Sequence, residues 1–164
     1  MLLRDYTPAD KSECVRIFAS NIPRYFRDHE RPDFEQFLDE QGCPYLILQQ
    51  GNEKQIVGCG GYAVRADGGA DLCWGMIAQE FHRQGLGEYL LVARLMRIVA
   101  EPSAKSVRLG TCQLTSAFFE KYGFHVQSIN AGAIANGLDD VEMNAHIDQA
   151  FRARIQQQWQ ELNA

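Results

Sequence analysis

The sequence predicts a mixed α/β fold, in which one mixed sheet is flanked by helices. Short segments rich in Val, Ile, Leu and Tyr are separated by Gly, Pro and Asn turns, which is typical of strands. Several longer segments instead repeat their apolar residues at helical spacing. No internal repeat, linker or low-complexity segment interrupts the 164 residues. We therefore expect one domain covering residues 1–164, with the order β-α-α-β-β-β-α-β-α-β-β and an added C-terminal helix.

The first half of the chain predicts four strands and two helices. In order, the expected elements are a strand at 2–6, helices at 7–21 and 31–42, and strands at 45–50, 55–64 and 70–78. The first helix should start at Thr7-Pro8, where a hydroxyl residue precedes proline at the first helical position. Glycines inside the segment 55–64 indicate a bulge or a close backbone approach in that strand.

The second half begins with a strongly helical segment. In order, we expect a helix at 86–101, a strand at 106–111, a helix at 115–122, strands at 124–129 and 140–147 around a loop, and a C-terminal helix at 147–164. Pro102 should end the first of these helices, and Gly123 should end the second in the left-handed conformation. Asp148 is a candidate N-cap for the last helix, whose apolar stripe must be covered by its own domain or by a second subunit.

Composition excludes several classes of protein. The net charge of −5 argues against broad binding to nucleic acid, which needs clustered Lys and Arg. No apolar run is long enough to span a bilayer, and the first residues do not resemble a secretory signal. The five cysteines form no C-x-x-C pair and the four histidines are isolated, so we expect reduced thiols and no metal site. These features predict a cytoplasmic protein that binds neither nucleic acid nor membrane.

The segment HRQGLG (82–87) lies where the strand at 70–78 meets the helix that follows it. A glycine turn at the start of a helix exposes backbone N–H groups at the positive helix end, which makes it a candidate anion site. The alternative is a tight turn with a packing glycine. A P-loop would need Gly-Lys-Ser/Thr after the turn, and a dinucleotide fingerprint would need a third glycine where Leu90 stands. The turn by itself leaves the anion site and the packing glycine open.

Two motifs together resemble one known family. The run from Asp71 to Leu91, followed by TSAFFEKYGF (115–124), is similar to the GNAT superfamily of acetyl-CoA-dependent N-acyltransferases. Its phosphate signature is Arg/Gln-x-x-Gly-x-Gly/Ala after the fourth strand, and its second signature is an aromatic helix end of the type F-Y-x-K-x-G-F. The resemblance covers the whole order of elements. It implies a mostly antiparallel sheet that is splayed between the fourth and fifth strands.

The resemblance also implies where acetyl-CoA would bind. The pyrophosphate would lie against backbone N–H groups of the glycine turn, and the pantetheine arm would bind backbone groups of the fourth strand. His82 stands at the first signature position, where the family usually has Arg or Gln. The cofactor residues implied in this way are Gly75, Ile77, His82, Arg83, Gln84, Gly85, Leu86, Gly87, Glu88, Cys112, Thr115 and Phe119.

Acetylation of an amine by a thioester needs a base for the amine and a proton for the leaving thiolate. Family members with a fourth-strand carboxylate carry it 14 residues before the first signature glycine, and 85 − 14 = 71, which implies Asp71 as the base. The alternative is that Asp71 caps a turn after Gly68-Gly69. Members of the family often use a tyrosine as the general acid that protonates the thiolate, and Phe119 stands at that position here. Tyr122, Cys112 or water would have to protonate the thiolate instead. No residue suggests an acyl-enzyme.

The acceptor side of the family's pocket is walled by the first two helices. Asn21, Tyr25 and Phe26 follow the first helix, so we expect them to contact the acceptor, with core packing of Tyr25 and Phe26 as the alternative. The leading hypothesis is an N-acetyltransferase that moves an acetyl group from acetyl-CoA to a small-molecule or peptide amine in a ternary complex. Its alternatives are a non-catalytic acyl-CoA-binding sensor, favoured by Phe119, and an unrelated nucleotide-binding domain. A homodimer through the C-terminal helix is a further expectation.

Overall fold

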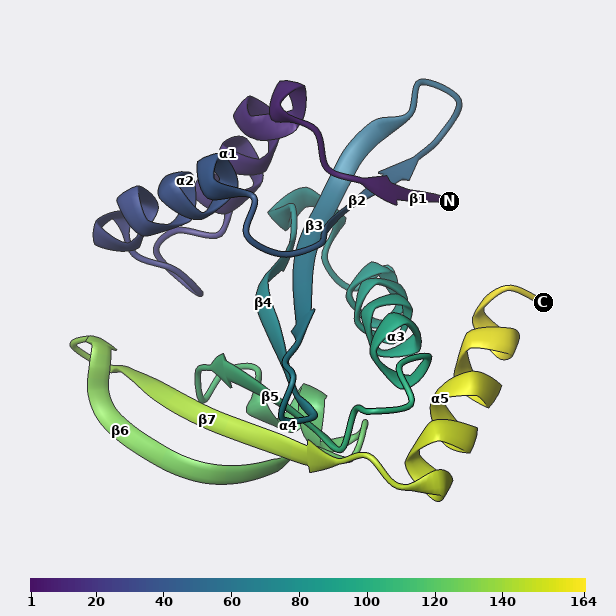
Figure 1. The fold of residues 1–164 in the computed structure, drawn as a ribbon. Coiled ribbons are helices and arrows are strands. Elements are labelled where there is room, and N and C mark those ends of the chain that lie inside the picture. Colours follow the sequence, from purple (N-terminus) through teal and green to yellow (C-terminus); the bar gives the residue numbers. More distant parts are fainter. The chain divides into compact units, whose positions relative to one another are not determined.

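A computed structural model describes residues 1–164, and the chain divides into two compact units (Figure 1). Unit 1 contains Met1–Tyr62 and Trp74–Arg94, and unit 2 contains Ala63–Cys73 and Leu95–Ala164. The single domain expected for residues 1–164 stays a prediction, and the two units are described in turn. No helix combines the length and the apolar composition that crossing a membrane requires.

The order of strands and helices agrees with the order predicted from the sequence. The strands are β1 (Leu2–Asp5), β2 (Tyr45–Gln50), β3 (Gln55–Val64), β4 (Gly69–Ile77), β5 (Ser106–Thr111), β6 (His125–Ala135) and β7 (Leu138–His146). The α-helices are α1 (Lys11–Ser20), α2 (Arg31–Glu40), α3 (Leu86–Val99), α4 (Ser116–Glu120) and α5 (Gln149–Leu162). The order of elements thus followed from patterns that are local in the sequence.

The strands are hydrogen-bonded in the order β1-β2-β3-β4-β5-β7-β6. The pairs β1–β2, β2–β3, β5–β7 and β6–β7 are antiparallel, whereas β4 and β5 are parallel. The parallel ladder contains only three pairs, from Gly69–Ser106 to Asp71–Arg108. This mixed, mostly antiparallel sheet with a short β4–β5 ladder confirms the predicted fold class.

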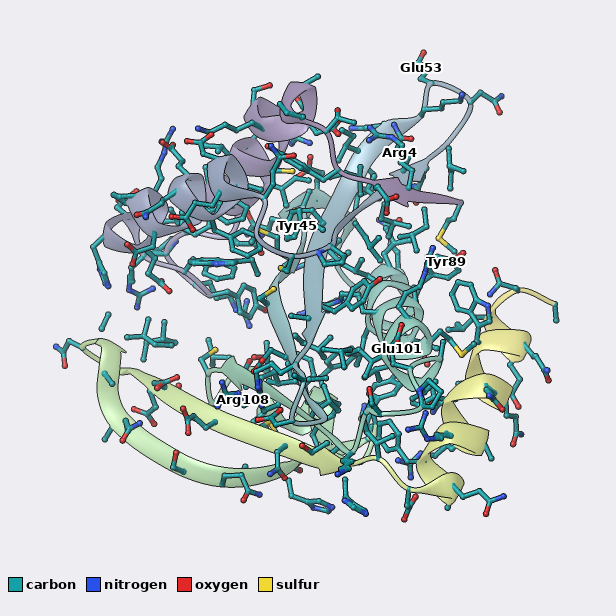
Figure 2. The ribbon with its side chains drawn as sticks, viewed as in Figure 1. Arg4, Tyr45, Glu53, Tyr89, Glu101 and Arg108 are labelled. Atoms are coloured by element: carbon teal, nitrogen blue, oxygen red, sulfur yellow. The ribbon has the colours of Figure 1, made fainter.

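In unit 1, α1 and α2 cover one side of the strands and α3 covers the other (Figure 1). Cys14, Ile17 and Phe18 of α1 are fully buried, as their helical spacing requires of a face that packs on a sheet. Six aromatic residues gather on this side, and Tyr45 of β2 marks their position in Figure 2. They are Phe18, Phe26, Phe34, Phe37, Tyr45 and Trp74.

Trp74 interrupts β4 with a left-handed backbone, at φ 44°. Such a conformation is unfavourable for a bulky residue and persists only where its surroundings hold it. The Tyr45 hydroxyl donates a hydrogen bond of 2.8 Å to the Trp74 carbonyl, and the Trp74 ring packs 5.0 Å from that of Phe34. The aromatic cluster therefore fixes the irregular point of β4.

The glycines of β3 make room for a buried guanidinium group. Arg94 of α3 is 5% exposed and donates to the carbonyls of Leu90 and Gly61, at 3.2 and 3.4 Å. A Cβ atom at Gly60 would lie 3.1 Å from the Arg94 guanidinium, and one at Gly75 would lie 2.6 Å from it. The close approach expected in the segment 55–64 is thus an approach of Arg94 to the backbone.

An ion pair joins β1 to the turn that precedes α1. Both terminal nitrogens of Arg4 donate to the Asp10 carboxylate at 2.8 Å, and the Thr7 N–H donates to the same carboxylate at 2.8 Å. Asp10 is only 7% exposed. The hydrogen bonds from Arg4, more than any other cause, lower the pKa of Asp10 from 3.8 to about 2.

We expect Asp10 to stabilise the fold in a pH-dependent way. Because the pKa is lower in the folded state, the unfolded chain takes up the proton first as the pH falls. The contribution, about 2 kcal/mol, is therefore complete above about pH 4 and is lost between about pH 4 and pH 2. Urea unfolding of Asp10→Asn should show a lower stability at pH 7 and a flatter acid dependence than the wild type.

Asp39→Asn provides the matched control, since Asp39 is 63% exposed in its ion pair with Lys11. Exposed pairs contribute little to stability, about 0 to 1 kcal/mol. Equal losses for Asp10→Asn and Asp39→Asn at neutral pH would contradict the role assigned to the Arg4–Asp10 pair.

In unit 2, β6 and β7 form a long hairpin (Figure 1). The loop expected between 129 and 140 is wrong, because β6 continues to Ala135 and β7 begins at Leu138. Ala135 pairs with Leu138, so that Asn136 and Gly137 make a two-residue turn, with Gly137 at φ 76°. Asn-Gly is the strongest short hairpin signal in a sequence and could have predicted this turn.

Helix α5 packs within unit 2. The Asp148 side chain accepts a hydrogen bond of 2.8 Å from the Phe151 N–H, which confirms the predicted cap. Phe151 and Ile155 are buried, and Arg152 donates to carbonyls that follow α3, including that of Ala104 at 2.6 Å. Half of the apolar stripe of α5 is thus covered by its own unit, and the homodimer stays a prediction.

Candidate functional site

The candidate anion site is the turn that joins β4 to α3 in unit 1. A short 3-10 turn at Gln79–Phe81 is followed by two left-handed residues, Arg83 at φ 62° and Gly85 at φ 78°. The Gly85 carbonyl then accepts the first helical hydrogen bond, of 3.1 Å, from the Tyr89 N–H. This local path brings the beginning of α3 to the end of β4.

Four consecutive N–H groups, from Gly85 to Glu88, make no hydrogen bond within the protein. The first N–H groups of a helix have no carbonyl one turn earlier to bind. They lie at the positive end of the 14-residue helix α3. The backbone of this turn can therefore bind an anion without any basic side chain.

The space beside both glycines is open. A Cβ atom at Gly85 would meet no atom within 4 Å, and one at Gly87 would meet only Ile77 Cγ1, at 3.9 Å. Packing within the protein therefore requires glycine at neither position, although the positive φ of Gly85 favours it there. The N–H groups of the turn are therefore accessible on this side, and the phosphate site implied by the resemblance stays a prediction.

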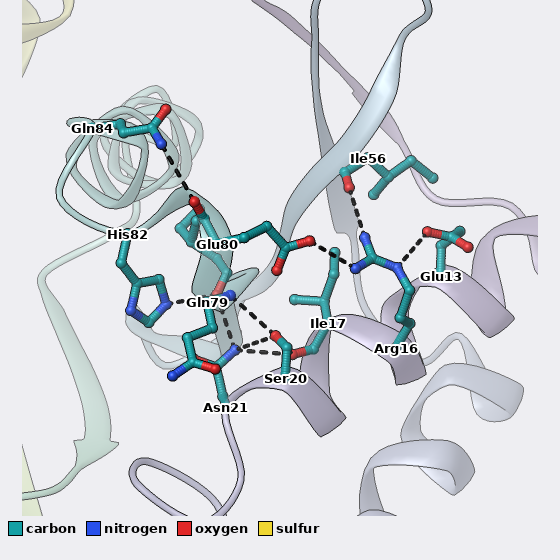
Figure 3. A network of polar contacts seen from close by, with 11 residues as sticks. Glu13, Arg16, Ile17, Ser20, Asn21, Ile56, Gln79, Glu80, His82 and Gln84 are labelled. Carbon is teal, nitrogen blue, oxygen red and sulfur yellow. Dashed lines mark hydrogen bonds and ion pairs between the residues drawn. The ribbon is translucent and has the colours of Figure 1, made fainter.

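The turn is anchored to the end of α1 by a polar network (Figure 3). The Ile77 carbonyl accepts hydrogen bonds of 2.9 Å from Asn21 Nδ2 and from His82 Nε2. The hydroxyl of Ser20 accepts a hydrogen bond of 3.1 Å from the Gln79 N–H. Arg16 adds an ion pair of 3.0 Å to Glu80. The turn, called the phosphate turn below (residues 82–88), is thus held by side chains at the end of α1 and by its own His82.

This network reassigns two of the predicted site residues. Asn21, expected at the acceptor, is 4% exposed, and its amide also donates to the Ile17 carbonyl at 2.9 Å. His82, expected near the pyrophosphate, directs its ring at the Ile77 carbonyl and packs 5.6 Å from Tyr25. Both side chains are engaged in positioning the turn. Sequence spacing could not reveal this, because 56 positions separate Asn21 from Ile77.

The other residues predicted around the turn lie where a ligand could reach them. Arg83 and Gln84 are exposed, Glu88 is half-buried, and the side chain of Leu86 is buried beneath the turn. Gly75 is exposed on β4, although the guanidinium of Arg94 occupies the direction of its missing side chain. The backbone of Ile77 was expected to bind the pantetheine arm, and its carbonyl already accepts hydrogen bonds from two donors.

The predicted base lies in an ion-pair cluster of unit 2. Asp71 pairs with Arg65 through one carboxylate oxygen and with Arg108 through the other. The turn is capped instead by Asp67, whose carboxylate accepts a hydrogen bond of 2.8 Å from the Gly69 N–H. Asp71 is thus not the turn cap considered from the sequence. To give a proton to Asp71, an amine or a water molecule would have to bind a carboxylate oxygen that already contacts a guanidinium group.

The candidate proton donors gather around α4. Tyr122 is 6% exposed and packs 5.2 Å from Phe118, and Phe119 packs 6.0 Å from Phe124. The Cys112 thiol is 4% exposed and lies 3.7 Å from the Thr115 hydroxyl, which also contacts the hydroxyl of Thr111. Burial leaves neither Tyr122 nor Cys112 in direct contact with solvent.

A polar groove of about 410 Å³ opens on one face of unit 2. Strand residues from β4, β5, β6 and β7 line it, and those with polar side chains are Asp71, Arg108, Gln127, Glu142 and Asn144. Sequence reasoning found only Asp71. The alternation of buried and polar residues in SVRLGT (106–111) and DVEMNAHI (140–147) contained the signal for Arg108, Glu142 and Asn144.

Comparison with known proteins agrees with these features. A family model described as an acetyltransferase (GNAT) domain matches residues 19–147. The fold is similar to the ribosomal-protein-alanine N-acetyltransferase of Brucella melitensis, at 20% identity and TM-score 0.71, with 90% of this chain and 100% of that chain covered. It is also similar to the ribosomal-protein-S18-alanine N-acetyltransferase of Escherichia coli, at 19% identity and TM-score 0.72, with 90% and 94% covered.

A third similar structure is an aminoglycoside 6′-N-acetyltransferase complexed with coenzyme A, at 14% identity and TM-score 0.69, with 91% of this chain and 99% of that chain covered. At such identities the likeness concerns the fold. No curated protein matches the sequence.

Proposed function

Because the chain belongs to the GNAT acetyltransferase family, we propose that it moves an acetyl group from acetyl-CoA to a primary amine of a small molecule or peptide. Direct transfer in a ternary complex is the proposed route. The observation that carries this proposal is the phosphate turn, with its four N–H groups from Gly85 to Glu88 and its open space beside both glycines.

The turn would bind the diphosphate of coenzyme A. Hydrogen bonds from consecutive backbone N–H groups to a charged oxygen are stronger than bonds between neutral groups. Arg83 is exposed beside them and would add one cation. Acetyl-CoA would supply the thioester that is attacked, and this chain's residues would orient it and manage the protons.

For the protons, we assign Asp71 as the base that accepts the amine proton through water. Family members often protonate the thiolate with a tyrosine, and Phe119 has no proton to give. We assign this role to Tyr122 acting through water, with Cys112 as the alternative. Tyr25, beside His82, and Phe26, whose ring lies 5.1 Å from Phe18, would form the acceptor wall.

A second candidate function is a non-catalytic acyl-CoA-binding module. Two observations favour it, namely Phe119 at the usual tyrosine position and the two guanidinium groups on Asp71. Thiol release from acetyl-CoA across a panel of amines separates the candidates. Release with at least one amine supports the enzyme, whereas binding of acetyl-CoA without release supports the module.

We expect Gly87→Ala to weaken coenzyme A binding by about 10- to 30-fold, because the added methyl group would hold the diphosphate away from the N–H groups. The fold should be unaffected, since the new Cβ would make only an ordinary contact with Ile77, at 3.9 Å. Titration calorimetry with coenzyme A, ATP and NAD measures the affinities, and thermal unfolding measures the stability.

Gly42→Ala is the matched control, because a Cβ atom there also meets nothing within 4 Å and Gly42 lies outside the turn. It should leave the coenzyme A affinity unchanged. Unchanged affinity in Gly87→Ala, or tighter wild-type binding of ATP or NAD than of coenzyme A, would overturn the proposed phosphate site.

A further inference from the structure

The polar groove of unit 2 lies on the face of the sheet opposite its apolar core. Val107 and Leu109 of β5 and Met143 of β7 are buried, whereas Arg108, Gly110, Glu142 and Asn144 alternate with them and point to the other face. In the register of the strands, Arg108 is opposite Asn144 and Gly110 is opposite Glu142. The volume of about 410 Å³ falls within the range of small-molecule sites, about 300 to 1,000 Å³.

One end of the groove presents an arginine with a free edge. Asp71 is shared by Arg65 and Arg108, and Arg65 also lies 3.5 Å from Asp67, so the charges of this cluster are balanced. Arg108 uses only its Nε for this pair, and its terminal nitrogens donate no hydrogen bond within the protein. The Arg108 side chain is 68% exposed. The free edge of this guanidinium has the geometry that binds a carboxylate through two hydrogen bonds.

The other end of the groove is negative. Glu142 is exposed and forms no ion pair, and its one hydrogen bond comes from the Ser128 hydroxyl at 3.3 Å. The residue opposite it is Gly110, which has no side chain to fill the groove. Glu142 and Arg108 are diagonal neighbours on adjacent strands, at a typical separation of about 7 Å, but they do not pair. Arg108 instead turns toward β4.

From the free edge of Arg108 and the unpaired Glu142 we propose that the acceptor is a small amine that carries its own carboxylate, such as a free amino acid. The carboxylate would bind the free edge of Arg108, which would keep the adjacent amino group within water-mediated reach of Asp71, and Glu142 would draw the ammonium group into the groove. Gln127 and Asn144 would offer amide groups along the same groove. An amine without an anionic group would leave Arg108 unused. This inference rests on the proposed acetyltransferase function and adds the class of its substrate.

The test measures acetyl-CoA-dependent thiol release with each common L-amino acid. For each one that responds, its carboxamide and its decarboxylated amine are measured beside it. We expect kcat/KM for the amino acid to exceed that for both derivatives by about 10-fold or more, because charge-assisted pairing is lost in the derivatives. Arg108→Gln removes a partner of Asp71 for every acceptor, so the readout is the ratio of kcat/KM for the amino acid to that for its decarboxylated amine, which should fall to about one.

Three further variants make the test specific. Arg108→Lys keeps the charge and should keep most of the preference. Glu142→Gln should lower kcat/KM for every charged amine. Asp140→Asn is the matched control, because Asp140 lies two positions before Glu142 on the same face of β7 but does not line the groove. It should behave as the wild type.

Three results would overturn the inference while leaving the proposed function intact. They are equal or better activity with decarboxylated amines, an equal loss for all acceptors in Arg108→Gln, and thiol release with amines but with no amino acid. Failure of the proposed function is recognised separately, by calorimetry that finds no coenzyme A binding. In that case the inference falls with it.

Discussion

Replacing Asp71 with asparagine is expected to lower kcat by about 100-fold or more, while coenzyme A affinity stays within about twofold of the wild type. The amide has nearly the shape of the carboxylate but cannot take up the amine proton. Asp71 belongs to the β4–β5 ladder of unit 2, whereas the phosphate turn belongs to unit 1. Steady-state kinetics and titration calorimetry measure the two effects independently.

The ion pairs of Asp71 make a control necessary. Asp67→Asn is matched, because Asp67 lies 3.5 Å from Arg65 and an asparagine oxygen can still accept from the Gly69 N–H. Arg65→Gln removes one partner of Asp71 and keeps the carboxylate. Both variants should retain most of kcat. Full activity of Asp71→Asn at every pH at which the protein is folded would dismiss Asp71 as the base.

Replacing Gly68 with alanine should cost about 3 kcal/mol of unfolding free energy. Gly68 has a φ of 89°, which is strained for any residue with a Cβ atom. The new Cβ would lie 2.6 Å from the Ser103 carbonyl oxygen, a backbone atom that cannot rotate away. The Gly68 carbonyl also accepts a hydrogen bond of 2.7 Å from the Lys105 N–H, which holds the two segments together. Urea unfolding measures the loss.

Gly137→Ala separates the strain from the clash. Gly137 has a similar φ of 76°, but a Cβ atom there would meet nothing within 4 Å. Its loss should be limited to the left-handed strain, about 1 to 2 kcal/mol. If both variants lost the same free energy, the proposed clash with Ser103 would be wrong.

Structural elements that depend on neighbouring residues could be predicted from the sequence. The helix from Leu86, the cap at Asp148 and the glycine turn were all predictable, because each depends on residues within a few positions of one another. The predicted cap at Thr7 is wrong, because the Thr7 hydroxyl makes no cap hydrogen bond and α1 begins only at Lys11, after a 3-10 turn at Pro8–Asp10. The Asn136-Gly137 turn was equally local, and its signal was present. The extension of β6 and β7 to this turn was therefore within the reach of the sequence.

The roles of single polar side chains could not be predicted from the sequence. Asn21 looked like a pocket residue, and only the folded chain brings its amide to the Ile77 carbonyl. Asp71 was considered as a base or as a turn cap, whereas in the folded chain its carboxylate accepts a hydrogen bond from Arg108, 37 positions away. The glycines of β3 indicated a bulge or a close backbone approach, and only the folded chain shows that Arg94 makes this approach at Gly60.

The amino-acid sequence by itself determined the order of elements, the family and the glycine turn before α3, since these follow from backbone preferences and spacing along a short stretch of chain. The tertiary structure alone decided which side chains remain available to a ligand. Strand register determines which side chain lies beside each charged side chain, and it brings together residues that no local sequence pattern connects.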